Sequence, residues 1–270
     1  MKRSLLVVGI LAGYCALSGS EAGGRLTLAL KGGLSSPRSG TFNNEIVPSV
    51  NLSIQDFLSQ AAAFGFDTKS DELEKIGLGP MAGCEIEWFF RPRISLAAGV
   101  EYFKRAPSAS SRASGSEGAA VYDLTQNYDI KASVIPVLAT VRYHLPLGKF
   151  RAYAGAGAGY YWGSLGFNVN FDLKVNGVSA GSDMTVTEGT GRAVVPHLNA
   201  GLDFSLMKRI SLAADVRYSF GKIKSFKINR QTDNDLVGRN ITYINAQGDE
   251  KTVMWELDGF TAGLMIKIRF

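Results

Sequence analysis

Apolar and polar residues alternate one by one along several long segments of this chain, and a period of two residues is typical of β-strands. In the last of these segments every second position from Phe260 to Phe270 is apolar, while Lys267 and Arg269 lie on the opposite face. The same alternation recurs in seven earlier segments, at residues 26–30, 78–90, 94–102, 128–143, 150–160, 194–206 and 210–220. The pattern therefore predicts eight strands, each with one apolar and one more polar face.

The links between these strands alternate in length. Short links at 91–93, 145–149 and 207–209 take turns with long ones at 37–76, 106–120, 166–191 and 221–257. This is typical of transmembrane barrels. Because backbone polar groups in lipid must be paired within the protein, a sheet in lipid has to close on itself. We therefore expect an all-β fold, an eight-stranded antiparallel, up-and-down transmembrane β-barrel with long extracellular loops and short periplasmic turns.

Aromatic residues gather near the ends of the expected strands, where girdles at the two membrane interfaces are expected. The predicted periplasmic girdle consists of Trp88, Phe89, Phe90, Tyr143, Phe150 and Phe270. The predicted outer girdle consists of Tyr102, Phe103, Tyr160, Tyr161, Trp162, Tyr218 and Phe220.

The N-terminal residues have the composition of a secretion signal. Two basic residues precede a short apolar run over 5–17, and small residues follow. Cleavage after Ser20 and cleavage after Ala22 fit this pattern equally well. We expect a signal peptide over 1–22 and an outer-membrane β-barrel domain over 23–270.

The polar faces of the strands carry charges that should point into the barrel. The basic candidates are Lys31, Arg142, Arg151, Arg217, Lys267 and Arg269, and the acidic candidates are Glu85, Glu87, Glu101, Asp203 and Asp215. The interior of an eight-stranded barrel is just wide enough for side chains to fill it. Opposite charges are expected to pair there, because an isolated buried charge is costly. The pattern indicates either a plugged interior or a narrow polar path for small solutes.

Two segments give the chain a family resemblance. Residues 135–143 (IPVLATVRY) and 150–160 (FRAYAGAGAGY) resemble the outer-membrane β-barrel domain of OmpA-like, OmpW-like and opacity-type proteins. The resemblance implies a place in the cell outer membrane, with outer-membrane lipid, lipopolysaccharide and the barrel assembly machinery as partners. Phe270 resembles the C-terminal aromatic residue by which that machinery recognises its clients. The same scaffold hosts adhesins, pores, membrane staples and lipid-modifying enzymes, so the resemblance does not select an activity.

Few residues offer catalytic or metal-binding chemistry. Cys15 falls within the predicted signal peptide, which leaves Cys84 as the one cysteine and no disulfide to expect. His197 is predicted to join hydrogen bonds inside the barrel, whereas His144, beside a short turn, is predicted to be solvated. Similar barrels that deacylate lipid A carry a His-x-Ser pair on the lipid-facing surface, but here Asn199 replaces the serine. We therefore predict no catalytic, cofactor-binding or metal-binding residues.

The long links would carry specificity. Apolar residues at helical spacing over 54–64, with Ser53 as N-cap, predict a short helix over the barrel mouth. The segment 107–118 is rich in Ser, Ala and Gly and is predicted to be mobile, and alternation within 222–256 predicts a hairpin above the membrane.

These features favour a non-enzymatic barrel with a structural or surface-interaction role, which binds an extracellular ligand through its loops. Two other functions stay open: an OmpW-like narrow passive conduit for small or hydrophobic molecules and, with less support, a lipid-modifying enzyme. Nucleic acid is not an expected partner, because the net charge of +5 is mild and the basic residues are scattered.

Overall fold

The structure is a computed structural model that describes residues 25–232, 234–245 and 248–270. The predicted signal peptide over 1–22 lies outside the described residues and stays a prediction. Within the described part of the chain, no helix has the length and apolarity needed to cross a membrane.

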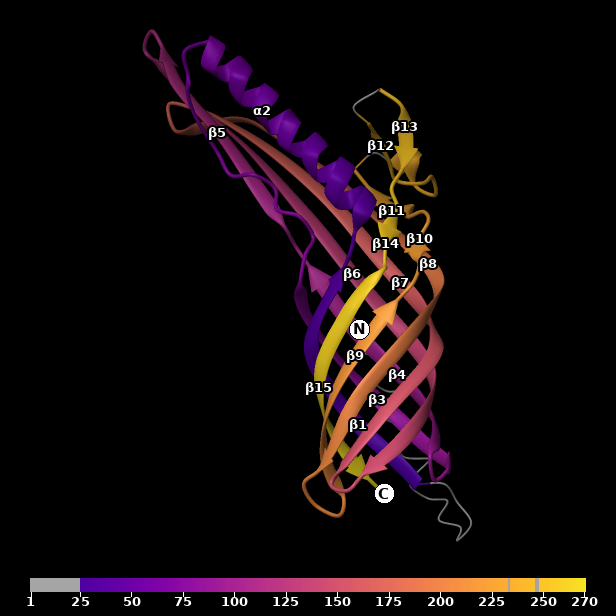
Figure 1. The fold of residues 1–270 in the computed structure, drawn as a ribbon. Coiled ribbons are helices and arrows are strands. Elements are labelled where there is room, and N and C mark those ends of the chain that lie inside the picture. Colours follow the sequence, from indigo (N-terminus) through magenta and orange to yellow (C-terminus); the bar gives the residue numbers. More distant parts are fainter. Residues whose placement is uncertain (1–24, 233, 246–247) are drawn as a thin grey trace.

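Eight antiparallel strands form a ring, as the alternation predicts (Figure 1). Each strand pairs with the next along the ring, and the last pairs with the first, which closes it. In ring order they are β1 (Arg25–Pro37), β3 (Gly79–Arg91), β4 (Ile94–Arg105), β6 (Ala120–Leu147), β7 (Phe150–Val175), β8 (Val178–Ser205), β9 (Ile210–Ser219) and β15 (Gly259–Arg269).

Following Cα partners once around the ring shows how strongly the strands tilt. The path starts at Thr27 on β1 and returns to β1 at Pro37, an offset of ten residues (37 − 27 = 10). Its intermediate steps are Glu87, Ala97, Thr140, Gly157, His197, Ser219 and Gly259. With about 3.3 Å per residue and about 4.8 Å between strands, this offset tilts the strands by about 40° from the barrel axis.

The faces of the strands alternate as expected. On β15 the outward Leu264 and Ile266 are 71% and 53% exposed, whereas the inward Met265 and Lys267 are 1% and 2% exposed. Such outward apolar side chains form the band that faces lipid. The aromatic prediction was wrong for Phe89, Phe103 and Tyr161, which are buried inside the barrel. These three lie at strand ends, but each occupies an inward position of the alternation.

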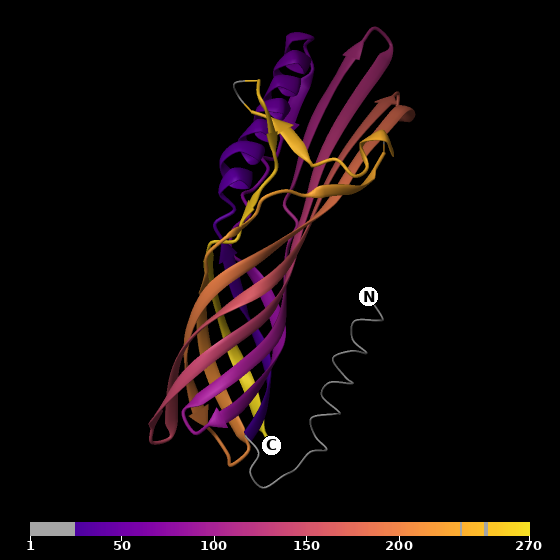
Figure 2. The same ribbon diagram turned by 90° about the vertical axis from the view of Figure 1, so that its right-hand side faces the viewer.

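Two segments that were expected to be loops are strands. Residues 166–175 continue β7, residues 178–191 form the first part of β8 after a turn at 176–177, and 108–117 form β5 (Ser108–Glu117), which pairs with β6. β2 (Asp67–Ser70) pairs with β5, and β11 (Lys227–Gln231) pairs with β8. These strands and the outer halves of β6, β7 and β8 form a sheet that stands clear of the ring (Figure 2). We call this sheet, together with α2, the outer platform.

The predicted helix exists, but it begins earlier and lies elsewhere. A π-helical turn η1 (Phe42–Ile46) leads into α2 (Val47–Ala63). Ser53 lies inside the helix, where its hydroxyl donates to the Ser49 carbonyl, so it is not the N-cap. The helix runs beside β5 along the platform instead of across the barrel mouth (Figure 1).

The last long link folds back over the ring in short elements. They are β10 (Lys222–Ile223), which pairs with β14 (Trp255–Glu256), the turn η2 (Asn234–Leu236), and the hairpin of β12 (Thr242–Ile244) and β13 (Glu250–Thr252). This hairpin is the one that the alternation within 222–256 predicts.

Candidate functional site

The barrel interior has two layers. The layer toward the short turns is ionic, and the layer toward the platform is apolar. Nine charged residues that were predicted to face inward make ion pairs with one another, and we call them the ion-pair network. Its members are Lys31, Glu85, Glu87, Glu101, Arg142, Asp203, Asp215, Arg217 and Lys267.

The outer part of the network centres on two bases, which lie on the two strands that flank β15. Arg217 on β9 donates two hydrogen bonds to the Glu101 carboxylate on β4, at 2.8 and 2.5 Å. The Lys31 ammonium on β1 lies 3.1 Å from Glu101 Oε1 and 2.6 Å from Asp215 Oδ1. All four groups are buried, so the charges are neutralised by one another and little by water.

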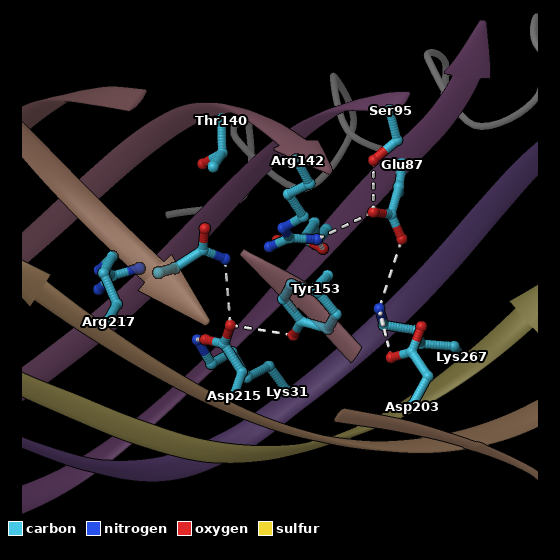
Figure 3. A network of polar contacts seen from close by, with 12 residues as sticks. Lys31, Glu87, Ser95, Thr140, Arg142, Tyr153, Asp203, Asp215, Arg217 and Lys267 are labelled. Carbon is cyan, nitrogen blue, oxygen red and sulfur yellow. Dashed lines mark hydrogen bonds and ion pairs between the residues drawn. The ribbon is translucent and has the colours of Figure 1, made fainter. Parts of the chain in front are cut away.

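The inner part of the network has the same pattern (Figure 3). Arg142 on β6 donates two hydrogen bonds to Glu85 and lies 3.3 Å from Glu87 Oε1. Lys267 on β15 lies 3.3 Å from Glu87 Oε2 and 2.9 Å from Asp203 Oδ1. Glu87 therefore connects a base on β6 with a base on β15 across the barrel.

Tyr153, which was not among the predicted site residues, joins the two parts. Its hydroxyl donates to Asp215 Oδ2 at 3.0 Å. The charged ends of Arg142 and Lys267 lie 4.9 and 4.8 Å from the centre of its ring. A cation beside an aromatic face is stabilised by the ring quadrupole. The available signal was its parity, because Tyr153 falls on the inward face of β7 between Arg151 and Gly155.

The two other residues predicted to face inward lie near strand ends. The Arg151 guanidinium is half-buried and lies 5.3 Å from the centre of the Phe89 ring. Arg269 is half-buried near the end of β15, where its backbone N–H donates to the Arg209 carbonyl at 2.8 Å.

The prediction that His144 is solvated was wrong. Its ring is 1% exposed, and Nε2 lies 2.8 Å from Ser95 Oγ and 3.2 Å from Glu87 Oε1. β6 continues beyond the predicted strand end, so position 144 follows position 142 on the inward face. His197 also lies inside the barrel, and its Nε2 is 2.8 Å from Thr140 Oγ1, which confirms the predicted interior hydrogen bond.

The glycines on the inward faces make room that side chains fill. A Cβ added at Gly155 would lie 2.6 Å from Asn199 Oδ1 and 2.8 Å from Arg142 Cγ. A Cβ at Gly201 would lie 2.3 Å from the Tyr153 hydroxyl oxygen. The space beside Gly155 and Gly201 is therefore filled by neighbouring polar side chains.

An apolar layer, which we call the apolar seal, lies between the network and the platform. The strands contribute Phe103, Val134, Leu138, Tyr161, Leu165 and Val195, and the last link contributes Ile223, Phe226, Trp255 and Leu257. The Trp255 indole N–H donates to Ser39 Oγ at 3.0 Å, and the Arg38 backbone N–H donates to the Asp258 carbonyl at 2.7 Å. These bonds tie the first and last links together over the ring.

A small cavity of about 30 Å³ remains where the two layers meet. Glu101 and Arg217 line one side, and Phe103, Tyr161 and Leu257 line the other. This volume has room for about one water molecule. Among the described residues, no group of three or more His, Cys, Asp or Glu side chains is placed to hold a metal ion.

The family match agrees with this architecture. The sequence profile of a family described as "Outer membrane protein beta-barrel domain" matches residues 10–266. No curated protein matches the chain. Similar solved structures include the Neisserial surface protein A (10% identity, 94% of this chain and 100% of that chain covered, TM-score 0.39). Others are OprG from Pseudomonas aeruginosa (13%, 92% and 96%, 0.39) and Ail of Yersinia pestis (11%, 92% and 99%, 0.36).

Proposed function

The chain belongs to the outer membrane protein β-barrel domain family and is a protein of the cell outer membrane, and on that premise we propose that it is a closed anchor that presents an extracellular binding surface. The observation that carries the proposal is a contrast within one molecule. The interior of the ring is filled, while three of its strands extend far beyond the ring.

The packing of the interior supports the closed state. Arg142, Arg217 and Lys267 are each no more than 5% exposed, although each carries a full charge. Opening a path would separate such buried partners, and breaking one buried pair typically costs about 3–5 kcal/mol. The apolar seal covers these charged residues on the extracellular side.

The length of the strands supports the presented surface. β6 has 28 residues, which extend over about 90 Å at about 3.3 Å per residue. Crossing about 30 Å of hydrocarbon at the tilt of this barrel takes only about 40 Å of strand. More than a third of β6 therefore lies in water, where connecting and projecting segments commonly bind ligands.

Planar-bilayer recording tests the closed interior. Purified protein that shows the heat-dependent gel shift of a folded barrel is expected to insert without conductance. Reproducible conductance steps from the folded protein would overturn the closed state and support the OmpW-like conduit. That alternative has one observation in its favour, the cavity of about 30 Å³ below an apolar upper lining.

Cysteine labelling on intact cells tests the presented surface. In a Cys84→Ser background, Ser179→Cys on the platform is expected to react with a membrane-impermeant maleimide. The matched variant Met207→Cys, at a short turn, is expected to react only after the outer membrane is permeabilised. The reverse pattern would contradict the orientation on which the proposal depends.

The proposal includes no catalysis. His197, which stood nearest to a catalytic pattern in the sequence, is hydrogen-bonded to Thr140 inside the barrel. The mass profile of lipid A from cells that express the protein is expected to match that of cells without it. A new lipid A species that depends on His197 would restore the enzymatic alternative.

A further inference from the structure

A groove of about 770 Å³ lies between α2 and the hairpin of β12 and β13, on the side of the ring that carries the platform (Figure 2). We call it the helix–hairpin groove. Its two sides are joined by a hydrogen bond from the Tyr243 hydroxyl to the Glu45 carboxylate. Ligand sites in proteins commonly have volumes of about 300–1,000 Å³. The groove is therefore large enough for a small molecule.

One part of the groove is apolar and open to water. Pro48 and Leu52 are four residues apart on α2, and Ile244 and Met254 contribute from the hairpin side. The Leu52 and Ile244 side chains are 56% and 59% exposed. A ligand that covers them releases water from apolar surface, which is favourable. This part of the groove thus favours a ligand with an apolar body.

The polar groups beside it are hydrogen-bond acceptors. The Ser49 hydroxyl donates to the Glu45 carbonyl at 2.8 Å, and the Ser53 hydroxyl donates to the Ser49 carbonyl at 3.1 Å. The Tyr243 hydroxyl donates to the Glu45 carboxylate. These three hydroxyl groups have only lone pairs left for a ligand, and an ionised carboxylate has no hydrogen to donate. A ligand that binds here therefore has to supply the hydrogens.

The charges around the groove favour a cation. The chain has no Lys or Arg over 39–68, so Glu45 has no basic neighbour on its own side of the groove. On the hairpin side Lys251 lines the groove, but its ammonium pairs with Asp249 Oδ2 at 3.3 Å. Glu250 adds a further negative charge to the hairpin. The Tyr243 ring also lines the groove, and an aromatic face attracts a cation.

From the apolar part, the acceptor groups and the carboxylate we infer that the helix–hairpin groove binds a small organic cation, which consists of a primary ammonium group on an apolar body. The ammonium donates to Glu45 beside the Tyr243 ring, and the body covers Leu52 and Ile244. The inference rests on the proposed function, because it assigns a ligand class to the extracellular binding surface. Binding by the purified protein can fail while the labelling of intact cells succeeds, so the two failures are distinguishable.

Calorimetric titration of the purified, folded full chain tests the inference. The probe is phenethylammonium, and phenethyl alcohol and hydrocinnamate serve as neutral and anionic probes of similar shape. Micelles of the same zwitterionic detergent without protein provide the baseline. A hydrogen bond to a charged group typically contributes about tenfold or more in affinity, so the ammonium should bind at least about tenfold more tightly than the alcohol. The anion should bind most weakly. Equal affinities of the three probes would overturn the inference.

Substitutions locate the binding site. Glu45→Gln should weaken ammonium binding about tenfold and leave alcohol binding unchanged. The matched control is Asp56→Asn, which removes a charge from the same helix outside the lining of the groove and should bind like the wild type. Leu52→Lys adds a cation to the groove and should also weaken ammonium binding. Equal binding by Glu45→Gln and Asp56→Asn would overturn the inference.

Tyr243→Phe separates the charge of Glu45 from its structural role. The variant keeps the carboxylate and the aromatic ring and removes only the hydrogen bond between the two sides of the groove. It should therefore bind the ammonium almost as the wild type does. A loss in Tyr243→Phe equal to that in Glu45→Gln would assign a purely structural role to the carboxylate and overturn the inference.

Discussion

Replacing Arg217 with methionine should destabilise the barrel strongly, because it leaves a buried carboxylate with half of its partners. Methionine fills a similar volume but carries no charge. Glu101 loses two hydrogen bonds, of 2.8 and 2.5 Å, and keeps only the Lys31 ammonium at 3.1 Å. The ion-pair network then holds five acids and three bases in place of five and four.

The expected magnitude follows from the burial of both partners. Removing one partner of a buried ion pair typically costs 3–5 kcal/mol, and the remaining contact with Lys31 places this case at about 3 kcal/mol. Glu101→Gln should cost a similar amount, because it leaves the Arg217 guanidinium without a charged partner at Glu101. The double variant should recover about 2 kcal/mol of the summed loss, since no charge is then stranded.

The assay is urea unfolding of protein folded into lipid vesicles, followed by the heat-dependent gel shift. The matched control is Arg112→Met on the platform. Arg112 also donates two hydrogen bonds to a carboxylate, that of Asp123, at 2.8 and 2.5 Å, but it is exposed to water. An exposed pair contributes little, so the control should unfold like the wild type. Equal shifts in Arg217→Met and Arg112→Met, or no recovery in the double variant, would refute the reasoning.

Three further outcomes are expected. Gly201→Ala should destabilise the barrel by about 1–3 kcal/mol in the same unfolding assay, because its Cβ would lie 2.3 Å from the Tyr153 hydroxyl, whereas Gly32→Ala, with open space, should not. Partial burial and a hydrogen bond to the Glu45 carboxylate on η1 raise the pKa of Tyr243 to about 12. The bond should therefore stabilise the hairpin below about pH 10 and be lost as the pH rises toward 12. The phenolate absorbance difference between wild type and Tyr243→Phe should titrate near pH 12 and not near pH 10. Phe270→Ala should reduce the heat-shifted fraction in outer membranes of growing cells without changing the stability of protein refolded in vitro, and equal assembly would contradict the predicted recognition role.

The part of the fold inside the membrane could be predicted from the sequence because lipid enforces strict alternation. Each outward position must be apolar, so parity alone places Lys31, Asp215 and Lys267 inside. His144 was misplaced because the predicted strand stopped too early, not because parity failed. Phe89 was misplaced because its position near a strand end was given more weight than its parity.

The platform could not be predicted because water on both faces removes that constraint. Residues 108–117 are mostly Ser, Ala and Gly, and they form a strand only because β6 continues far enough to pair with them. Such pairing depends on residues distant in the sequence. The same holds for Tyr153, whose parity was visible but whose contacts with groups on β6, β9 and β15 depend on the register of the whole ring.

The buried ion pairs set the free energy that is needed to open the filled interior. A conducting state would require at least two buried pairs of the network to separate, at about 6–10 kcal/mol in total. At about 1.4 kcal/mol for each factor of ten, fewer than about one molecule in ten thousand would be open at any time. Conductance at a higher level would therefore require the charges to exchange partners, for example Lys31 moving from Glu101 to Asp215 alone while Arg217 retains Glu101. Such an exchange keeps every carboxylate paired, so it would leave the unfolding free energy almost unchanged.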